Sequence, residues 1–149
     1  MQSMIAAGAG FLLAVLWFDL MFDVQVLRYG DDDVPEPVLA SIAGYYRRVT
    51  TEARPLNRLV AAAMVATLLA IVLQATGDDV PRWVSVVSAV AAAAPIGLAA
   101  TRTVPNAVRL GARGDPVELQ RWLARSVCRD HIVCLPSIAA LLAVQLVWA

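Results

Sequence analysis

The sequence predicts an all-α integral membrane protein whose four helices cross the bilayer as an up-down-up-down bundle. Sixty per cent of its 149 residues are hydrophobic, and its mean hydropathy is +0.68; both values exceed those of an ordinary soluble domain. We expect one transmembrane domain, 1–149, because four crossings leave no room for a second. The apolar runs that predict the crossings are 4–26, 55–75, 83–100 and 132–148.

Each apolar run is about long enough to span a hydrocarbon layer of ~30 Å at 1.5 Å per residue. The first run has no basic start and exceeds the usual ~7–15 apolar residues of a secretory signal, so we expect a retained helix. The short link 76–82 makes the second and third helices antiparallel neighbours. Pro95 is expected to bend the third helix.

The distribution of positive charge predicts how the protein lies in the membrane. All 12 positively charged side chains are arginines. The only one in the short link is Arg82. The others follow the first or the third apolar run: Arg28, Arg47, Arg48, Arg54, Arg58, Arg102, Arg109, Arg113, Arg121, Arg125 and Arg129. Because basic residues near membrane ends stay in the cytoplasm, we expect Arg-rich cytoplasmic connections and outward-facing termini in a bacterial-type plasma membrane.

Net charge and cysteine content exclude some classes of function. The formal net charge is zero, so the chain has no bulk attraction to nucleic acid, and the lipid bilayer is its predicted partner. Cys128 and Cys134 lie six residues apart on an expected helix, where they point to different faces, and they lie at the reducing end. We therefore expect no structural disulfide. The absence of a C-x-x-C motif argues against a quinone-linked thiol oxidoreductase.

The two longer connections are expected to contain helices of their own. The acidic run 31–33 and two prolines lead into 38–49, which reads as a short helix at the membrane surface with Tyr45 and Tyr46 in the headgroup layer. One face of this helix carries Leu39, Ile42, Ala43 and Tyr46. In the other connection, Asp115-Pro116 is a helix start, and 117–129 is predicted to run into helix four as an amphipathic extension.

Aromatic and amide side chains are expected to mark the membrane–water interfaces. Trp122 would lie at the interface on the Arg-rich side, and Trp83 at the opposite one. Gln74, Gln145 and Trp148 also lie near the outer ends of their apolar runs. We interpret these three as interface residues.

Two carboxylates occur inside the first apolar run, where an ionised group costs up to ~2.5–3.5 kcal/mol. Asp19 lies about one turn inside the run, and Asp23 follows at i+4 on the same face. In one interpretation they pair with Arg54, Arg58 or Arg102 and lock the bundle. In the other they line a cytoplasm-facing pocket that binds a cation, a proton or a substrate. We expect an arginine, Arg58 or Arg102, to hold Asp19, because both lie at the same depth. Asp19→Asn should therefore destabilise the protein more than Asp23→Asn, which is nearer water and better screened.

His131, the only histidine, begins helix four at nearly the depth of the two carboxylates. Cys134 follows on the same face, and Ile138 and Gln145 continue that stripe. All four helices thus place polar groups at one end of the bundle. The mixed oxygen, nitrogen and sulfur set of Asp19, Asp23, His131 and Cys134 could hold a metal. It has no diagnostic ligand spacing, however, so we predict no metal site and leave the cofactor unknown.

The layout of the chain resembles a known family. The order is a Gly-containing first helix, an aromatic and basic connection, a Pro-Asn motif after the third helix, and Trp and His leading into the last. The matching residues are Arg54-Pro55, Val104-Pro105-Asn106-x-x-Arg109-Leu110, Trp122 and His131, with Cys134 at a position where the family tends to have Arg. This pattern resembles the small four-span membrane proteins grouped with anthrone oxygenases. The resemblance implies oxidation of a polycyclic phenolic substrate by O₂ without a bound cofactor.

The leading functional hypothesis is a small membrane enzyme or binding protein for an apolar aromatic molecule that enters from the bilayer. His131 would act as general base, since its unperturbed pKa of ~6.5 suits a phenolic proton, with Asp19 as the second catalytic residue. The expected substrate-binding residues are Trp17, Phe18, Phe22, Asp23, Asn57, Arg102 and Asn106. The alternative is a non-catalytic subunit or assembly factor whose Ala/Gly-rich helices pack on a membrane partner or on a second copy.

Overall fold

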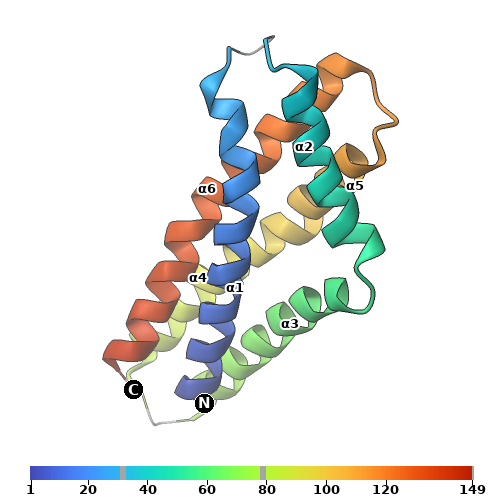
Figure 1. Ribbon diagram of the computed structural model, residues 1–149. Helices are drawn as coiled ribbons and strands as arrows, with labels where there is room; N and C mark the ends of the chain where they lie inside the picture. The colour runs from blue at the N-terminus through green and yellow to red at the C-terminus, as the bar shows by residue number, and fades with distance from the viewer. Residues whose placement is uncertain (31–32, 78–79, 149) are drawn as a thin grey trace.

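The computed structural model describes residues 1–30, 33–77 and 80–148, and these residues form helices and connections with no strand among them. Four helical stretches in this part of the chain are long and apolar enough to cross a membrane. They pack as a bundle with both termini at one end (Figure 1). The predicted four-helix transmembrane bundle is therefore confirmed, and the chain is a multi-pass membrane protein. The acidic pair 31–32 and positions 78–79 of the short link lie outside the described residues.

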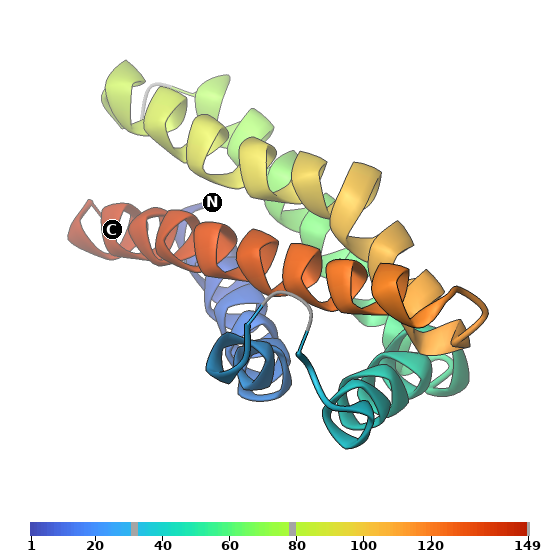
Figure 2. The same ribbon diagram turned by 90° about the horizontal axis from the view of Figure 1, so that it is seen from above.

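The crossings begin and end close to the predicted positions, with one exception. α1 (Gln2–Asp23) continues as a 3₁₀ turn (Val24–Arg28), and α3 (Leu56–Ala75) follows the predicted second run. α4 (Arg82–Leu98) and α6 (Val117–Val147) supply the other two crossings. In the view from above, α6 lies between α1 and α4, and it contacts both (Figure 2).

The third helix is longer than predicted. α4 leads without a break through a π turn (Ala99–Thr103) into α5 (Val104–Ala112), whereas the predicted third run ended at residue 100. Pro105 cannot donate an i→i−4 hydrogen bond inside a helix. The wide π turn before it places Pro105 in the first turn of a new α-helical segment, where the missing N–H is not needed.

The short helix of the first connection is confirmed as α2 (Glu36–Arg47), and its buried residues are the predicted Leu39, Ile42, Ala43 and Tyr46. This face does not turn toward lipid, because it packs on α5 and α6. The crossing with α5 is close at Gly111, where an added Cβ would lie 2.7 Å from the backbone nitrogen of Arg47. The absence of a side chain at Gly111 therefore allows α2 to reach α5.

The predicted amphipathic extension of helix four is confirmed, since α6 is one helix of 31 residues. At 1.5 Å per residue it is about 46 Å long, which exceeds the ~30 Å hydrocarbon layer. α2, α5 and the first half of α6 together form a helical head at the end opposite the termini (Figure 1). The head and the bundle have separate apolar cores. Leu39, Leu110 and Leu123 belong to the first core, and Ile5 and Ile138 belong to the second.

Near the termini, three polar side chains join three helices inside the bundle. The amides of Gln74 and Gln145 donate to each other at 3.1 and 3.2 Å, and Gln145 also donates to Ser88 Oγ at 2.7 Å. Both glutamines are buried, so the interpretation of Gln74 and Gln145 as interface residues is wrong. Trp83 and Trp148 are half exposed and pack edge to face at 5.3 Å.

Candidate functional site

A buried polar cluster lies where the bundle meets the head. α1 contributes Asp19 and Asp23 on one face, α2 contributes Tyr45 and Tyr46 from its last turn, and α6 contributes His131. Tyr46 belongs to the core of the head, and Ile138 of α6, two turns after His131, belongs to the core of the bundle. The cluster is therefore held between two apolar cores.

Asp23 is the centre of the cluster and is completely buried. Its Oδ2 lies 2.7 Å from Nδ1 of His131, and its Oδ1 accepts a hydrogen bond of 2.7 Å from the hydroxyl of Tyr46. A carboxylate at this distance accepts, so we assign the proton of the imidazole to Nδ1. Asp23 thereby sets both the tautomer and the orientation of His131.

The other ring nitrogen of His131 faces the second carboxylate. Nε2 lies 3.8 Å from Oδ2 of Asp19, and Oδ1 of Asp19 accepts a hydrogen bond of 2.6 Å from the hydroxyl of Tyr45. No arginine of the described chain forms an ion pair with Asp19; Arg102 pairs instead with Asp130, at 3.2 Å. The expectation that an arginine holds Asp19 is therefore wrong, because α2 supplies a phenol where we expected a guanidinium.

Both tyrosines act as neutral hydrogen-bond donors to the carboxylates. Burial raises the pKa of Tyr45 well above its usual value, and the nearby Asp19 carboxylate raises it further. Burial and the Asp23 carboxylate do the same to the pKa of Tyr46. The ring of Phe22 stacks on that of Tyr45, with centroids 4.2 Å apart and planes 10° apart. This stacking fixes the phenol that reaches Asp19.

An apolar cavity of about 100 Å³ adjoins the cluster inside the bundle. Asp19 and His131 are two of its polar lining residues, and Cys134 and Thr103 are the others. The remaining walls come from α1, α3, α4, the π turn, α5 and α6: Leu12, Val15, Leu16, Val60, Met64, Pro95, Ile96, Ala99, Val104 and Ile138. A molecule in this cavity would thus meet apolar walls together with one carboxylate and one imidazole.

The structure divides the predicted substrate-binding residues into separate groups. Asp23 and Phe22 belong to the cluster, through the imidazole and the Tyr45 ring respectively. Trp17 and Phe18 are 62% and 59% exposed on the outer face of α1, so they do not line the cavity. Asn57 donates to the backbone oxygen of Thr50 at 3.0 Å and holds the preceding connection instead.

Arg102 and Asn106 belong to a second polar group on a neighbouring face of α6. Both donate to the hydroxyl of Ser126, at 3.1 and 3.4 Å, and Arg102 also pairs with the buried Asp130. Thr103 donates to the same carboxylate at 3.1 Å. This group joins α6 to α5 and to the π turn before it. The structure does not bring Arg102 or Asn106 to the cavity that His131 lines.

The sequence interpretation missed Tyr45 and Tyr46, which we had placed among lipid headgroups. One signal was present, because Tyr46 shares the apolar face of its helix with Leu39 and Ile42. A buried tyrosine needs a partner for its hydroxyl, and the carboxylates of helix one needed donors.

Cys134 lines the cavity, but no group of three His, Cys, Asp or Glu side chains in the described residues could hold a metal ion. Cys128 and Cys134 are both free and buried.

Comparisons with known proteins find no relative of this chain. No protein-family model matches it, and neither a curated protein nor a solved structure matches it significantly. The geometry of the cluster and its cavity is therefore the basis for a functional assignment.

Proposed function

We propose that the protein binds a small apolar molecule with an acidic hydroxyl, such as a single-ring phenol, and that His131 accepts the proton of that hydroxyl. One observation carries this proposal. Asp23 holds Nδ1 of His131, and the other nitrogen is turned toward Asp19, while both Asp19 and His131 line the apolar cavity. A ligand hydroxyl in the cavity would therefore lie beside an oriented base.

Proton transfer from the phenol would produce a phenolate and an imidazolium. The imidazolium would lie between the carboxylates of Asp23 and Asp19, which favour the charged form of the ring over the neutral one. Tyr45 and Tyr46 hold the two carboxylates in place through their hydroxyl groups. The proton moves within the site, so the net charge inside the membrane does not change.

The size of the cavity supports a ligand smaller than the polycyclic phenol that the family resemblance implies. A cavity of ~150 Å³ is enough for benzene, and the volume here is about 100 Å³. A single ring would fit after small side-chain movements, whereas fused rings would require the helices to separate. In the oxygenase form of this proposal, the phenolate transfers one electron to O₂, and the resulting phenoxyl radical and superoxide combine to form a carbon–oxygen bond on the ring as a hydroperoxide anion.

A nitrophenol tests the proposal directly, because its phenolate is coloured and its neutral form is not. We expect the purified protein in detergent to bind nitrophenol as the phenolate at a pH where free nitrophenol is largely neutral. His131→Gln should bind it in the neutral form, and Trp17→Leu, on the outer face of α1, should behave like the wild type. Neutral bound nitrophenol in the wild type would disprove the role of His131.

Two further measurements separate the possible roles of the site. Oxygen consumption with a bound phenol would distinguish an oxygenase from a binding protein. A stoichiometric membrane protein that co-purifies in mild detergent would instead favour the non-catalytic subunit or assembly factor.

We also propose that the head and its arginines lie in the cytoplasm of a bacterial-type cell and that both termini face outward. The arginine distribution supports this orientation. Cysteines introduced one at a time by Ser3→Cys and Gly114→Cys would test it in intact cells, since the native Cys128 and Cys134 are buried and an added Cβ at Gly114 meets no atom within 4 Å. If an impermeant reagent labelled the Gly114→Cys variant from outside the cell, the proposed topology would be wrong.

A further inference from the structure

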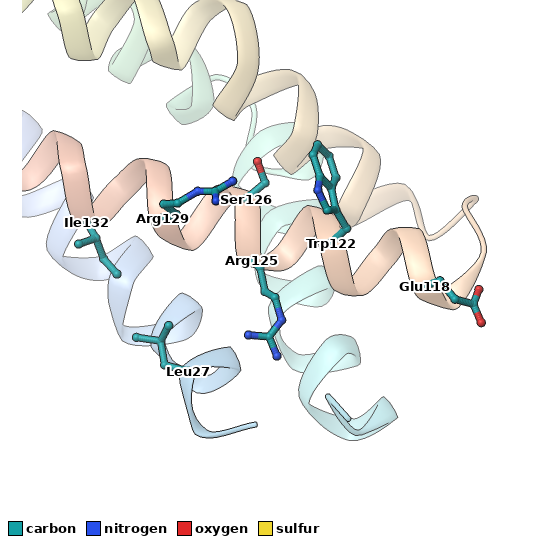
Figure 3. Close-up of a pocket in the computed structure, with 7 residues that line it drawn as sticks. All are labelled: Leu27, Glu118, Trp122, Arg125, Ser126, Arg129 and Ile132. Carbon is teal, nitrogen blue, oxygen red and sulfur yellow. The ribbon is translucent and has the colours of Figure 1, made fainter. Parts of the chain in front are cut away.

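A groove runs along one face of α6, apart from the His131 cluster. Its volume is about 540 Å³. Leu27, from the 3₁₀ turn that follows α1, forms one wall (Figure 3). The other lining residues all belong to α6, and apart from the adjacent Arg125 and Ser126 they follow one another at three or four positions, as neighbours on a helix surface do: Glu118, Trp122, Arg125, Ser126, Arg129 and Ile132.

The side chains that line the groove change along α6 from apolar to charged, as expected at a membrane–water interface. Ile132 begins the last apolar run, and Leu27 ends the first; the two side chains are 43% and 58% exposed. Arg129 lies about one turn farther from the hydrocarbon layer than Ile132, and Arg125 about two turns farther. Trp122 follows and is 52% exposed. Along the groove, the apolar side chains at the membrane end are thus followed by two arginines and then by an indole.

The two arginines are placed differently. Arg125 donates to the backbone oxygens of Tyr29 and Gly30, and the distance to Tyr29 is 3.0 Å. Its guanidinium is therefore held against the end of the first crossing. Arg129 is exposed, and its side chain forms no ion pair or hydrogen bond with any residue that the structure describes. The acidic residue of the groove, Glu118, lies 11 positions before Arg129, about 16 Å along the helix.

We propose that this groove binds an anionic glycerophospholipid. Its phosphate would accept hydrogen bonds from Arg129, because the planar guanidinium fork matches phosphate oxygens. The positive charge of Arg125 would add to the attraction. The acyl chains would lie against Leu27 and Ile132 and continue into the bilayer. The indole of Trp122 would pack beside the headgroup, as aromatic residues do at membrane interfaces. This site depends neither on the sidedness of the protein nor on the role of His131.

Native mass spectrometry of the protein in mixed micelles tests the site, with phosphatidylglycerol and phosphatidylcholine as competing probes. We expect the wild type to retain phosphatidylglycerol preferentially. Arg129→Gln should weaken that retention by about fivefold, the effect of one basic residue near an anionic lipid. Arg58→Gln is the matched control, because Arg58 is an exposed arginine at the start of α3 and does not line the groove.

Four results would overturn the proposal. Arg129→Gln could retain as much phosphatidylglycerol as the wild type, or Arg58→Gln could lose an equal amount, which would indicate diffuse attraction. Soluble glycerol phosphate could displace the lipid at equal concentration, which would indicate a site for free phosphate esters. Thermal melting in phosphatidylcholine micelles should be the same for both variants, and a lower value for Arg129→Gln alone would assign Arg129 a folding role instead.

Discussion

Asp23→Asn is expected to destabilise the protein more than Asp19→Asn, the reverse of the order that the sequence predicted. Asp23 is completely buried and accepts bonds of 2.7 Å from both Tyr46 and His131. An asparagine has one acceptor and one donor group at this place. If it accepts from Nδ1 of His131, its amide hydrogens face the hydroxyl of Tyr46, whose own proton then has no acceptor.

The magnitude follows from the bonds that each variant loses. Breaking a buried charged pair costs about 3–5 kcal/mol, and a hydrogen bond to a charged group contributes about 1.5–3 kcal/mol. We expect about 3 kcal/mol for Asp23→Asn, since the asparagine keeps one bond. Asp19→Asn should cost about 1 kcal/mol, because its amide oxygen can still accept from Tyr45 and the contact with His131 is long, at 3.8 Å.

Thermal melting of both variants in one detergent measures the difference. For a chain of 149 residues, 1 kcal/mol corresponds to about 2–4 °C. Asp23→Asn should therefore melt about 6–12 °C below the wild type and Asp19→Asn about 2–4 °C below it. If Asp19→Asn melted lower than Asp23→Asn, the assignment of Asp23 as the structural centre of the cluster would be refuted.

Three other perturbations have defined outcomes in the same melting assay. Gln145→Leu leaves the amide of Gln74 buried without its partner and should lower the free energy of unfolding by about 1–2 kcal/mol. A second change, Gln74→Leu, should restore most of that loss. A double variant as unstable as the single one would contradict this pairing. Gly111→Ala brings a methyl group within 2.7 Å of the α2 backbone and should cost about 1–3 kcal/mol, whereas Gly97→Ala, with no atom within 4 Å, should be neutral or stabilising. Raising the pH above about 10 should destabilise the wild type, because Tyr46 ionises there only in the unfolded chain, its pKa in the folded protein being raised by burial and carboxylates. Tyr46→Phe should lose part of that pH dependence, and an unchanged slope would argue against the buried phenol.

Features that depend on local spacing were predicted correctly from the sequence. The number of crossings follows from the length of each apolar run, because a bilayer accepts a helix only when its backbone is covered by apolar side chains. The buried face of α2 follows from 3.6-residue periodicity, which placed Leu39, Ile42 and Tyr46 together. The end of the third helix was not predicted, since the π turn before Pro105 continues the helix beyond residue 100.

The partners of the polar side chains were decided by the tertiary structure. The sequence placed Asp19, Asp23 and His131 at one depth, which follows from their positions on the helices. Depth does not determine which side chain meets which. An arginine and a tyrosine of the same connection can both reach a carboxylate, and the choice depended on α2 packing against α5 at Gly111. That packing brings the phenols of Tyr45 and Tyr46 to the carboxylates, where we had expected an arginine. The sequence did not predict this arrangement, because contacts between helices far apart in the chain are not encoded in local periodicity.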